Sequence, residues 1–316
     1  MKKFLLTSSA LVASAGVAAA DVSISGSAEM GMFGGTENDA QFHNDWDVTF
    51  AMSGTTDNGL EFGASVDLDE ADSLGDEDGN PGGTVFISGG WGTLTMGDTD
   101  GAADWAISEA GGIGNPGTLA DDETGHAGAL NNVLDGEYDG QILRYDYTAG
   151  SFGVAVSAEI DDDDNLDPGF AVGAKYSMDI AAGSVDFGIG YQSVDSWSDV
   201  AGTDGAAGED LTAIAGSVAM ALDSGLSAGL HYTQLDADGV DATHIGVGAG
   251  YEVGAIALHA NYGQFDVDGS DDITGYGLAA AYDLGGGATI NLGYGNSDDR
   301  DGVETDTWSF GLSMSF

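Results

Sequence analysis

The chain has 316 residues, of which 54 are acidic and only 5 basic, and its formal net charge at pH 7 is −49. Because nucleic-acid binding requires clustered Lys and Arg, this balance excludes nucleic acid as a partner and favours cations. There is no cysteine, so disulfide and thiol chemistry are excluded as well.

Residues 1–20 have the three-part layout of a secretory signal peptide. Two lysines precede an apolar stretch that ends at Val17, and three alanines stand immediately before Asp21. The stretch is too short for a membrane helix, so we expect export and cleavage, with residues 21–316 as the mature chain. Losing two of the five cations and no acid gives the mature chain a formal charge of −51.

The mature chain consists of short segments in which apolar and small polar residues alternate. In the last one, Trp308, Phe310 and Leu312 fall on one face, and Ser309 and Gly311 on the other. This period of two predicts strands with one apolar and one polar face. No later run approaches the ~20 apolar residues of a membrane helix, so membrane insertion would require a closed barrel. We predict sixteen strands, at about residues 22–33, 43–53, 60–69, 83–89, 92–97, 141–148, 152–159, 169–178, 183–193, 210–222, 226–234, 244–251, 255–265, 272–282, 288–295 and 305–316.

The predicted connections alternate between short turns and long acidic loops. Gly90-Trp91 and Asp223-Ser224-Gly225 are typical short turns, whereas residues 159–168 form a long loop with four consecutive aspartates. One consistently short end is typical of an outer-membrane barrel, and a soluble β-sandwich or β-propeller would not require it. Tyrosines near both ends of the apolar face, such as Tyr232 and Tyr251, predict two aromatic girdles. The opposite face carries mainly small polar residues, which favours a water-filled interior.

One connection is far longer than the others. It spans 43 residues from Asp98 to Gly140, and Ala102 to Ile107 are expected to form a short helix within it. An ordered loop of this length is usually functional. Its acidic residues are Asp98, Asp100, Asp104, Glu109, Asp121, Asp122, Glu123, Asp135, Glu137 and Asp139.

The segment GTLTMGDTDGAAD from Gly92 and the segment LRYDY from Leu143 resemble the third-loop region of alphaproteobacterial general porins of the Rhodobacter type. The mature start, DVSISGSAEMG from Asp21, and the terminal Phe316 are similar to that family too. The resemblance implies an all-β fold, a 16-stranded antiparallel transmembrane β-barrel with a long third loop folded into the pore. It also implies a homotrimer in the cell outer membrane, joined through strands one to five and sixteen. Phe316 would be part of the signal that the outer-membrane assembly machinery recognises.

The resemblance further implies a constriction in which acidic loop residues face a cluster of Arg and Lys on the wall. This chain departs from that pattern, since its mature part holds only Arg144, Lys175 and Arg300 as permanent cations. Arg144, Lys175, His231 and His259 have inward parity in their strands. The two histidines would add charge only near or below pH ~6.5. An acidic ring with weak basic opposition should attract cations and repel anions. The predicted constriction residues are Asp98, Asp100, Asp104, Glu109, Asp121, Asp122, Glu123, Arg144 and Lys175.

The sequence leaves metal binding open. Residues 76–80 and 236–239 resemble calcium loops without matching the EF-hand pattern, so solvated acidic loops are favoured there. No cofactor is expected beyond loosely bound Ca²⁺ or Mg²⁺ at the acidic loops, where such an ion would bridge neighbouring anionic headgroups of the surrounding lipid and lipopolysaccharide.

Besides a channel, a barrel of this kind could be an enzyme or a surface adhesin. No motif joins a serine to a histidine as a hydrolase would require, so we expect no enzymatic activity. The alternative is a barrel that acts mainly as an adhesin or surface scaffold, with acidic loops that bind divalent cations. The favoured prediction is a passive diffusion channel for small hydrophilic solutes and ions that prefers cations, although the acidity also fits a saline habitat.

Overall fold

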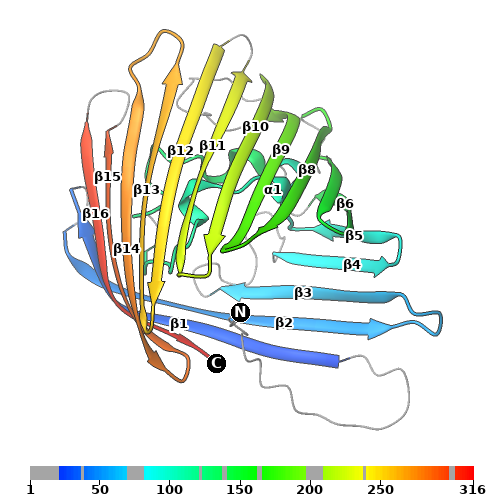
Figure 1. Cartoon of the computed structure of the whole chain (residues 1–316), viewed down its shortest axis with the longest axis horizontal. Helices are drawn as coiled ribbons and strands as arrows, with labels where there is room; N and C mark the ends of the chain where they lie inside the picture. The colour runs from blue at the N-terminus through cyan, green and yellow to red at the C-terminus, as the bar shows by residue number, and fades with distance from the viewer. Residues whose placement is uncertain are drawn as a thin grey trace.

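The computed structural model describes residues 21–36, 39–69, 82–120, 123–136, 141–161, 166–196, 209–237, 240–298 and 303–316, so the predicted signal peptide lies outside it. These residues form a closed barrel of sixteen antiparallel strands, in which each strand pairs with its sequence neighbours and β1 also pairs with β16 (Figure 1). The strands are β1 (Asp21–Gly35), β2 (Gln41–Thr55), β3 (Glu61–Asp69), β4 (Gly83–Gly89), β5 (Gly92–Gly97), β6 (Ile142–Ala149), β7 (Phe152–Glu159), β8 (Gly169–Ile180), β9 (Gly183–Ser196), β10 (Glu209–Leu222), β11 (Leu226–Ala237), β12 (Val240–Val253), β13 (Ile256–Val267), β14 (Ile273–Gly285), β15 (Ala288–Asp298) and β16 (Glu304–Ser315).

The end of the chain closes the ring. The backbone N–H of Phe316 donates to the carbonyl oxygen of Gly26 at 2.9 Å, and the N–H of Gly26 donates back to Phe316 at 3.3 Å. These bonds extend the β1–β16 ladder, so neither strand has a free edge at this seam.

The alternation of side chains separates an apolar outside from a polar inside. In β16, Phe310 is 52% exposed on the outer face, whereas its neighbour Ser309 is 3% exposed and points inward. Tyrosines predicted for the two girdles are exposed on the outer face at both strand ends, as Tyr232 and Tyr251 illustrate. A barrel with this outer surface is suited to lipid, and its polar lining to water.

All sixteen strands were predicted, and the main differences lie at their long-loop ends. β12 begins at Val240 rather than at residue 244, and β11 ends at Ala237 rather than at residue 234. The backbone pairing continues beyond the alternating pattern, through the polar pair Asp236↔Asp241 to Ala237↔Val240. Hydrogen bonding between strands does not need an apolar face, so the pattern marks only the lipid-covered part of each strand.

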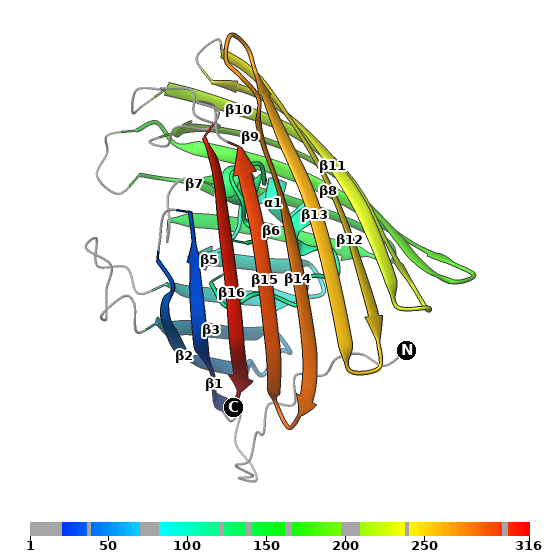
Figure 2. The ribbon, with the colours of Figure 1, turned by 90° about the vertical axis from the view of Figure 1, so that its left-hand side faces the viewer.

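The connection between β5 and β6 folds inside the barrel. It contains α1 (Ala102–Ala106), which confirms the predicted short helix, and the 3₁₀ turns η1 (Ala110–Gly112) and η2 (Asn131–Leu134). Figures 1 and 2 both show α1 within the ring of strands. In the described part of the chain, no helix is long and apolar enough to cross a membrane.

Candidate functional site: the pore constriction

The third loop, residues 98–140, first runs across the inner wall from β7 towards β16. Its backbone N–H groups donate to inward side chains on successive parts of the wall. Ala102 donates to Ser157 Oγ on β7 at 2.9 Å, and Ser108 donates to Ser217 Oγ on β10 at 2.9 Å. Further along, Leu119 donates to the Ser309 hydroxyl on β16 at 3.3 Å. Small hydroxyl residues therefore fix the loop close to the sheet.

The loop then returns along the same half of the barrel. Ala127 N–H donates to Ser297 Oγ on β15 at 2.9 Å, and Gln192 Nε2 on β9 donates to the Val133 carbonyl at 3.1 Å. A backbone bond from Gly101 N–H to Asp135 O joins the beginning of the loop to its end. In a ring of sixteen strands, β3 and β4 lie opposite β11 and β12, so β2–β5 form the wall across the lumen from the loop.

Inward glycines allow this close approach. A Cβ added at Gly173 on β8 would overlap the carbonyl oxygen of Ala102, and one at Gly188 on β9 would overlap that of Ala106. The same holds for Gly248 on β12 and the carbonyl oxygen of Ala110. Glycine at these inward positions thus lets the loop backbone lie directly on the sheet.

The two inward cations predicted from strand parity, Arg144 and Lys175, bind the loop to the part of the wall that the loop covers. Arg144 Nη1 on β6 donates to the carbonyl oxygen of Asp100 at 2.6 Å, and Arg144 Nε lies 3.8 Å from Asp146 Oδ1. Lys175 Nζ on β8 donates to the carbonyl oxygen of Trp105 at 3.0 Å and lies 3.5 Å from that residue's ring centroid. Both positive charges are therefore engaged at the two ends of α1.

An acidic cluster, consisting of Asp100, Asp104 and Asp135, lies beside Arg144. Their carboxylate oxygens lie within 4.8 Å of one another, close enough to hold a metal ion, and the Asp100 side chain is 61% exposed. Burial, together with the charge of Asp100, raises the pKa of Asp104 to about 6, although Arg144 and Lys175 act in the opposite direction. Asp104 is thus mainly ionised at pH 7, and the cluster is an anionic feature of the loop.

The wall opposite the loop is acidic as well. Residues 21–97, which include β1–β5, contain no Lys and no Arg. The inward positions of β2 and β3 include Asp47, whose carboxylate accepts from Ser27 Oγ at 2.8 Å, and Asp67, which accepts from Thr49 Oγ1 at 3.1 Å. The basic wall implied by the resemblance is therefore missing from this side of the barrel, and acidic residues stand there instead.

The comparisons with known proteins identify the family. A family model described as Gram-negative porin matches residues 7–302. This chain belongs to the Gram-negative porin family. A porin from Rhodobacter capsulatus is 35% identical over 308 residues, which cover 88% of this chain and 95% of that protein. A solved porin structure has a TM-score of 0.74 and 28% identity, covering 94% of this chain and 100% of that one. A triple mutant of Rhodopseudomonas blastica porin, with a TM-score of 0.65 and 16% identity over the same shares, supports the fold alone.

As a porin, the protein is an outer-membrane channel. The comparisons confirm the predicted family, and the closed sixteen-stranded barrel confirms the predicted fold. Proteins of this family are channels rather than enzymes.

The structure does not bring all the predicted constriction residues together. Asp98 lies exposed directly after β5, next to the cluster residues in sequence, whereas Asp121 and Asp122 lie outside the described residues. Glu123 is 0% exposed and packs beside Gly293 on β15, so its prediction as a pore-lining residue is wrong. The reason is the close contact that glycine permits. At Gly293 the loop lies so near the wall that the side chain of Glu123 is buried between them.

Glu109 is partly buried beneath the loop. It lines a cavity between the loop and β11–β13, together with His231 and His244. Burial raises the pKa of Glu109 to about 8, and the charges of Asp104 and Asp135 contribute. Parity predicted that His231 points inward, but the sequence carries no signal that the loop would cover it.

Proposed function

We propose that this porin is a passive diffusion channel for small hydrophilic solutes and ions that prefers cations. The main support is the absence of Lys and Arg from residues 21–97, which include β2–β5, the wall opposite the loop. On the loop side, Arg144 and Lys175 are bonded to loop carbonyl oxygens. An anion at the narrow zone would therefore meet acidic residues on both sides, whereas a cation would be attracted by both.

The proposed constriction consists of the exposed Asp98 and the acidic cluster on one side, with Asp47 and Asp67 on the other. Asp121 and Asp122 are proposed to add to the loop side. Arg144 and Lys175 act mainly as supports that hold α1 on the wall. Because the carboxylates face water, their attraction for ions should weaken as ionic strength rises.

Reversal potentials in planar bilayers under a KCl gradient test the selectivity. We expect a potential that corresponds to preferred K⁺ permeation, larger at 0.05 M than at 1 M salt. A chloride preference would contradict the proposal. A barrel that binds cells but forms no conducting pores would instead support the adhesin alternative.

The protein is proposed to act as a homotrimer in contact with lipid and lipopolysaccharide, and single-channel records should then show closures in three equal steps. Loosely bound Ca²⁺ or Mg²⁺ is proposed at the acidic cluster, whose carboxylates supply the oxygen ligands that these ions prefer. Millimolar Ca²⁺ should then reduce K⁺ conductance, and less so in Asp104→Asn.

A further inference from the structure

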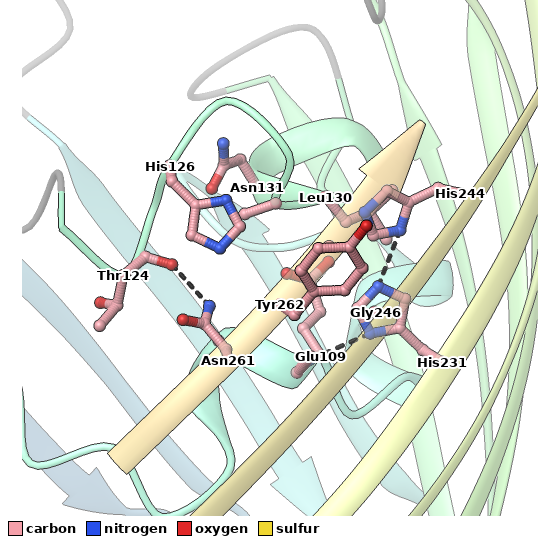
Figure 3. A pocket seen from close by; sticks show the side chains of 14 residues that line it. Glu109, Thr124, His126, Leu130, Asn131, His231, His244, Gly246, Asn261 and Tyr262 are labelled. Carbon is pink, nitrogen blue, oxygen red and sulfur yellow. Dashed lines mark hydrogen bonds between the residues drawn. The ribbon is translucent and has the colours of Figure 1, made fainter. Parts of the chain in front are cut away.

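Two histidines on neighbouring strands face each other beneath the third loop. His231 comes from β11 and His244 from β12, and each is 1% exposed. Their rings are stacked at 4.9 Å between centroids and 19° between planes, and His231 Nε2 lies 3.0 Å from His244 Nδ1 (Figure 3).

The backbone at each end of this pair fixes where the ring protons are. Ala110 N–H can only donate, and it lies 3.0 Å from His231 Nδ1, which must therefore accept. The neutral His231 ring then carries its proton on Nε2 and donates to His244 Nδ1. His244 in turn carries its proton on Nε2 and donates to the Gly128 carbonyl oxygen at 2.9 Å, which can only accept. All the ring nitrogens of the pair are satisfied in this single arrangement.

The hydrogen-bonded series Ala110–His231–His244–Gly128 begins and ends on backbone atoms of the third loop. Ala110 belongs to the run of the loop from β7 towards β16, and Gly128 belongs to the returning run. The two imidazoles therefore tie both runs to β11 and β12. A third inward histidine, His259 on β13, forms a separate link through Nδ1 to the Ile113 carbonyl oxygen at 2.9 Å.

Neither imidazole ring can take up a second proton without losing a hydrogen bond. A proton on Nδ1 of His231 would point at the N–H of Ala110, and one on Nδ1 of His244 would point at the N–H of His231. Protonation of either ring must therefore break a bond to the loop or between the rings, and it would place an unpaired charge in a buried site.

The groups around the pair do not offset that charge. Phe265 on β13 covers one face of His244 at 4.3 Å between ring centroids. Glu109 and His126 are the titratable loop residues that line the shared cavity, and Asn261 faces it from β13. Since burial raises the pKa of Glu109 to about 8, its carboxyl group is neutral in acid and supplies no anion. Burial and the nearby His244 lower the pKa of His126 to about 4, so this ring would add positive charge only near or below that pH.

We infer that His231 and His244 are positioning residues for the constriction, and that acid releases the third loop from β11 and β12 by protonating them. This inference rests on the proposed role of the loop in narrowing the pore. Released from the wall, the loop can move into the lumen, and the channel should close in discrete steps at low pH.

The proton positions are tested in the intact protein by ¹⁵N NMR of histidine in detergent micelles at pH 7. We expect both rings to be neutral with the proton on Nε2. A proton on Nδ1 of either ring, or an imidazolium at this pH, would overturn the inference. This readout does not depend on ion selectivity, so it is separate from the test of the proposed function.

Single-channel recordings between pH 7.5 and 3.5 test the consequence. The unaltered protein should show closures that become frequent in acid. The double variant His231→Gln/His244→Gln, whose amides can still bond to Ala110 and Gly128 but do not titrate, should lose most of them. His231→Phe fills the site without hydrogen bonds and should close already at pH 7.5. Each variant is first checked for its content of folded barrel by its mobility in unheated gels.

His43→Gln is the matched control, because His43 lies on β2 in the opposite wall, where its Nε2 is 3.6 Å from Glu29 Oε2. It should keep the acid-induced closures. Equal loss in His43→Gln and in the double variant, or closures that persist in the folded double variant, would show that acid acts on the lumen rather than on the loop. Reversal potentials at pH 7.5 should be cation-preferring in the unaltered protein and in His43→Gln, which separates this result from a failure of the selectivity proposal.

Discussion

Arg144 Nη1 donates to the backbone carbonyl oxygen of Asp100 at 2.6 Å, and the same atom lies 4.0 Å from that residue's carboxylate. The guanidinium of β6 thus joins the wall to the point where the third loop begins. It also places a positive charge directly beside the acidic cluster, where it reduces the attraction for a passing cation.

Replacing Arg144 with glutamine should increase the preference for cations. A unit charge acts with about 1 kcal/mol at 4 Å in water, less with screening, so the K⁺/Cl⁻ permeability ratio should rise roughly two- to fivefold. Arg144→Lys keeps the charge and serves as the control, with a ratio close to that of the unaltered protein. A lower ratio in Arg144→Gln, measured from reversal potentials, would contradict the electrostatic role.

A positive charge on the opposite wall should have the reverse effect. Asp67 lies on the inner face of β3, so Asp67→Lys changes the local charge by two units opposite the loop. We expect the K⁺/Cl⁻ ratio to fall at least several-fold, measured at 0.1 M salt. Asp223→Lys makes the same change in an exposed short turn and should leave the ratio nearly unchanged. Equal effects of both variants would mean that net charge, rather than this wall, sets selectivity.

The barrel could be predicted from the sequence because lipid and water impose an alternation on each strand. Trp308 to Phe316 illustrates this, as outward apolar and inward small residues are needed whatever the neighbouring strands are. The path of the loop carries no comparable periodicity. Gly188 and Gly173 look like ordinary inward small residues, and only the structure shows that loop carbonyl groups lie against them. Glu123 was misplaced for the same reason, because an acidic side chain in a loop gives no sign that glycines will allow its burial.

The role of inward glycine can be tested at β9. Gly188→Ala would place a methyl group against the Ala106 carbonyl oxygen and should push the end of α1 away from the wall. Because α1 then moves into the lumen, single-channel conductance should decrease by roughly a third or more. The nearest atom to a Cβ at Gly216, on the outer face of β10, is 3.8 Å away, so Gly216→Ala is the control and should conduct normally. Normal conductance in both variants would show that the contact does not position α1.

Glu109 gives the loop a pH dependence of opposite sign to the acid release proposed for the histidines. Its pKa is about 8 in the folded protein, against 4.5 for an ordinary glutamate, mainly because of burial. The folded loop therefore binds this proton more tightly than the unfolded loop does. The resulting stability is fully present below pH 4.5 and is lost as the pH rises through about 8.

Hydrogen exchange can follow this loss at the amides of Ser108 and Ala110, which are bonded to Ser217 and His231. After correction for the intrinsic dependence on pH, their protection should fall between pH 5 and 9. Glu109→Gln keeps a neutral side chain of similar shape at all these values, so its protection should vary little. Glu252→Gln makes the same change at an exposed position where β12 ends. In this variant, the protection of the Ser108 and Ala110 amides should fall as in the unaltered protein. If Glu109→Gln showed the full decline, another group would have to titrate beneath the loop, and burial of Glu109 would not control its attachment in alkali.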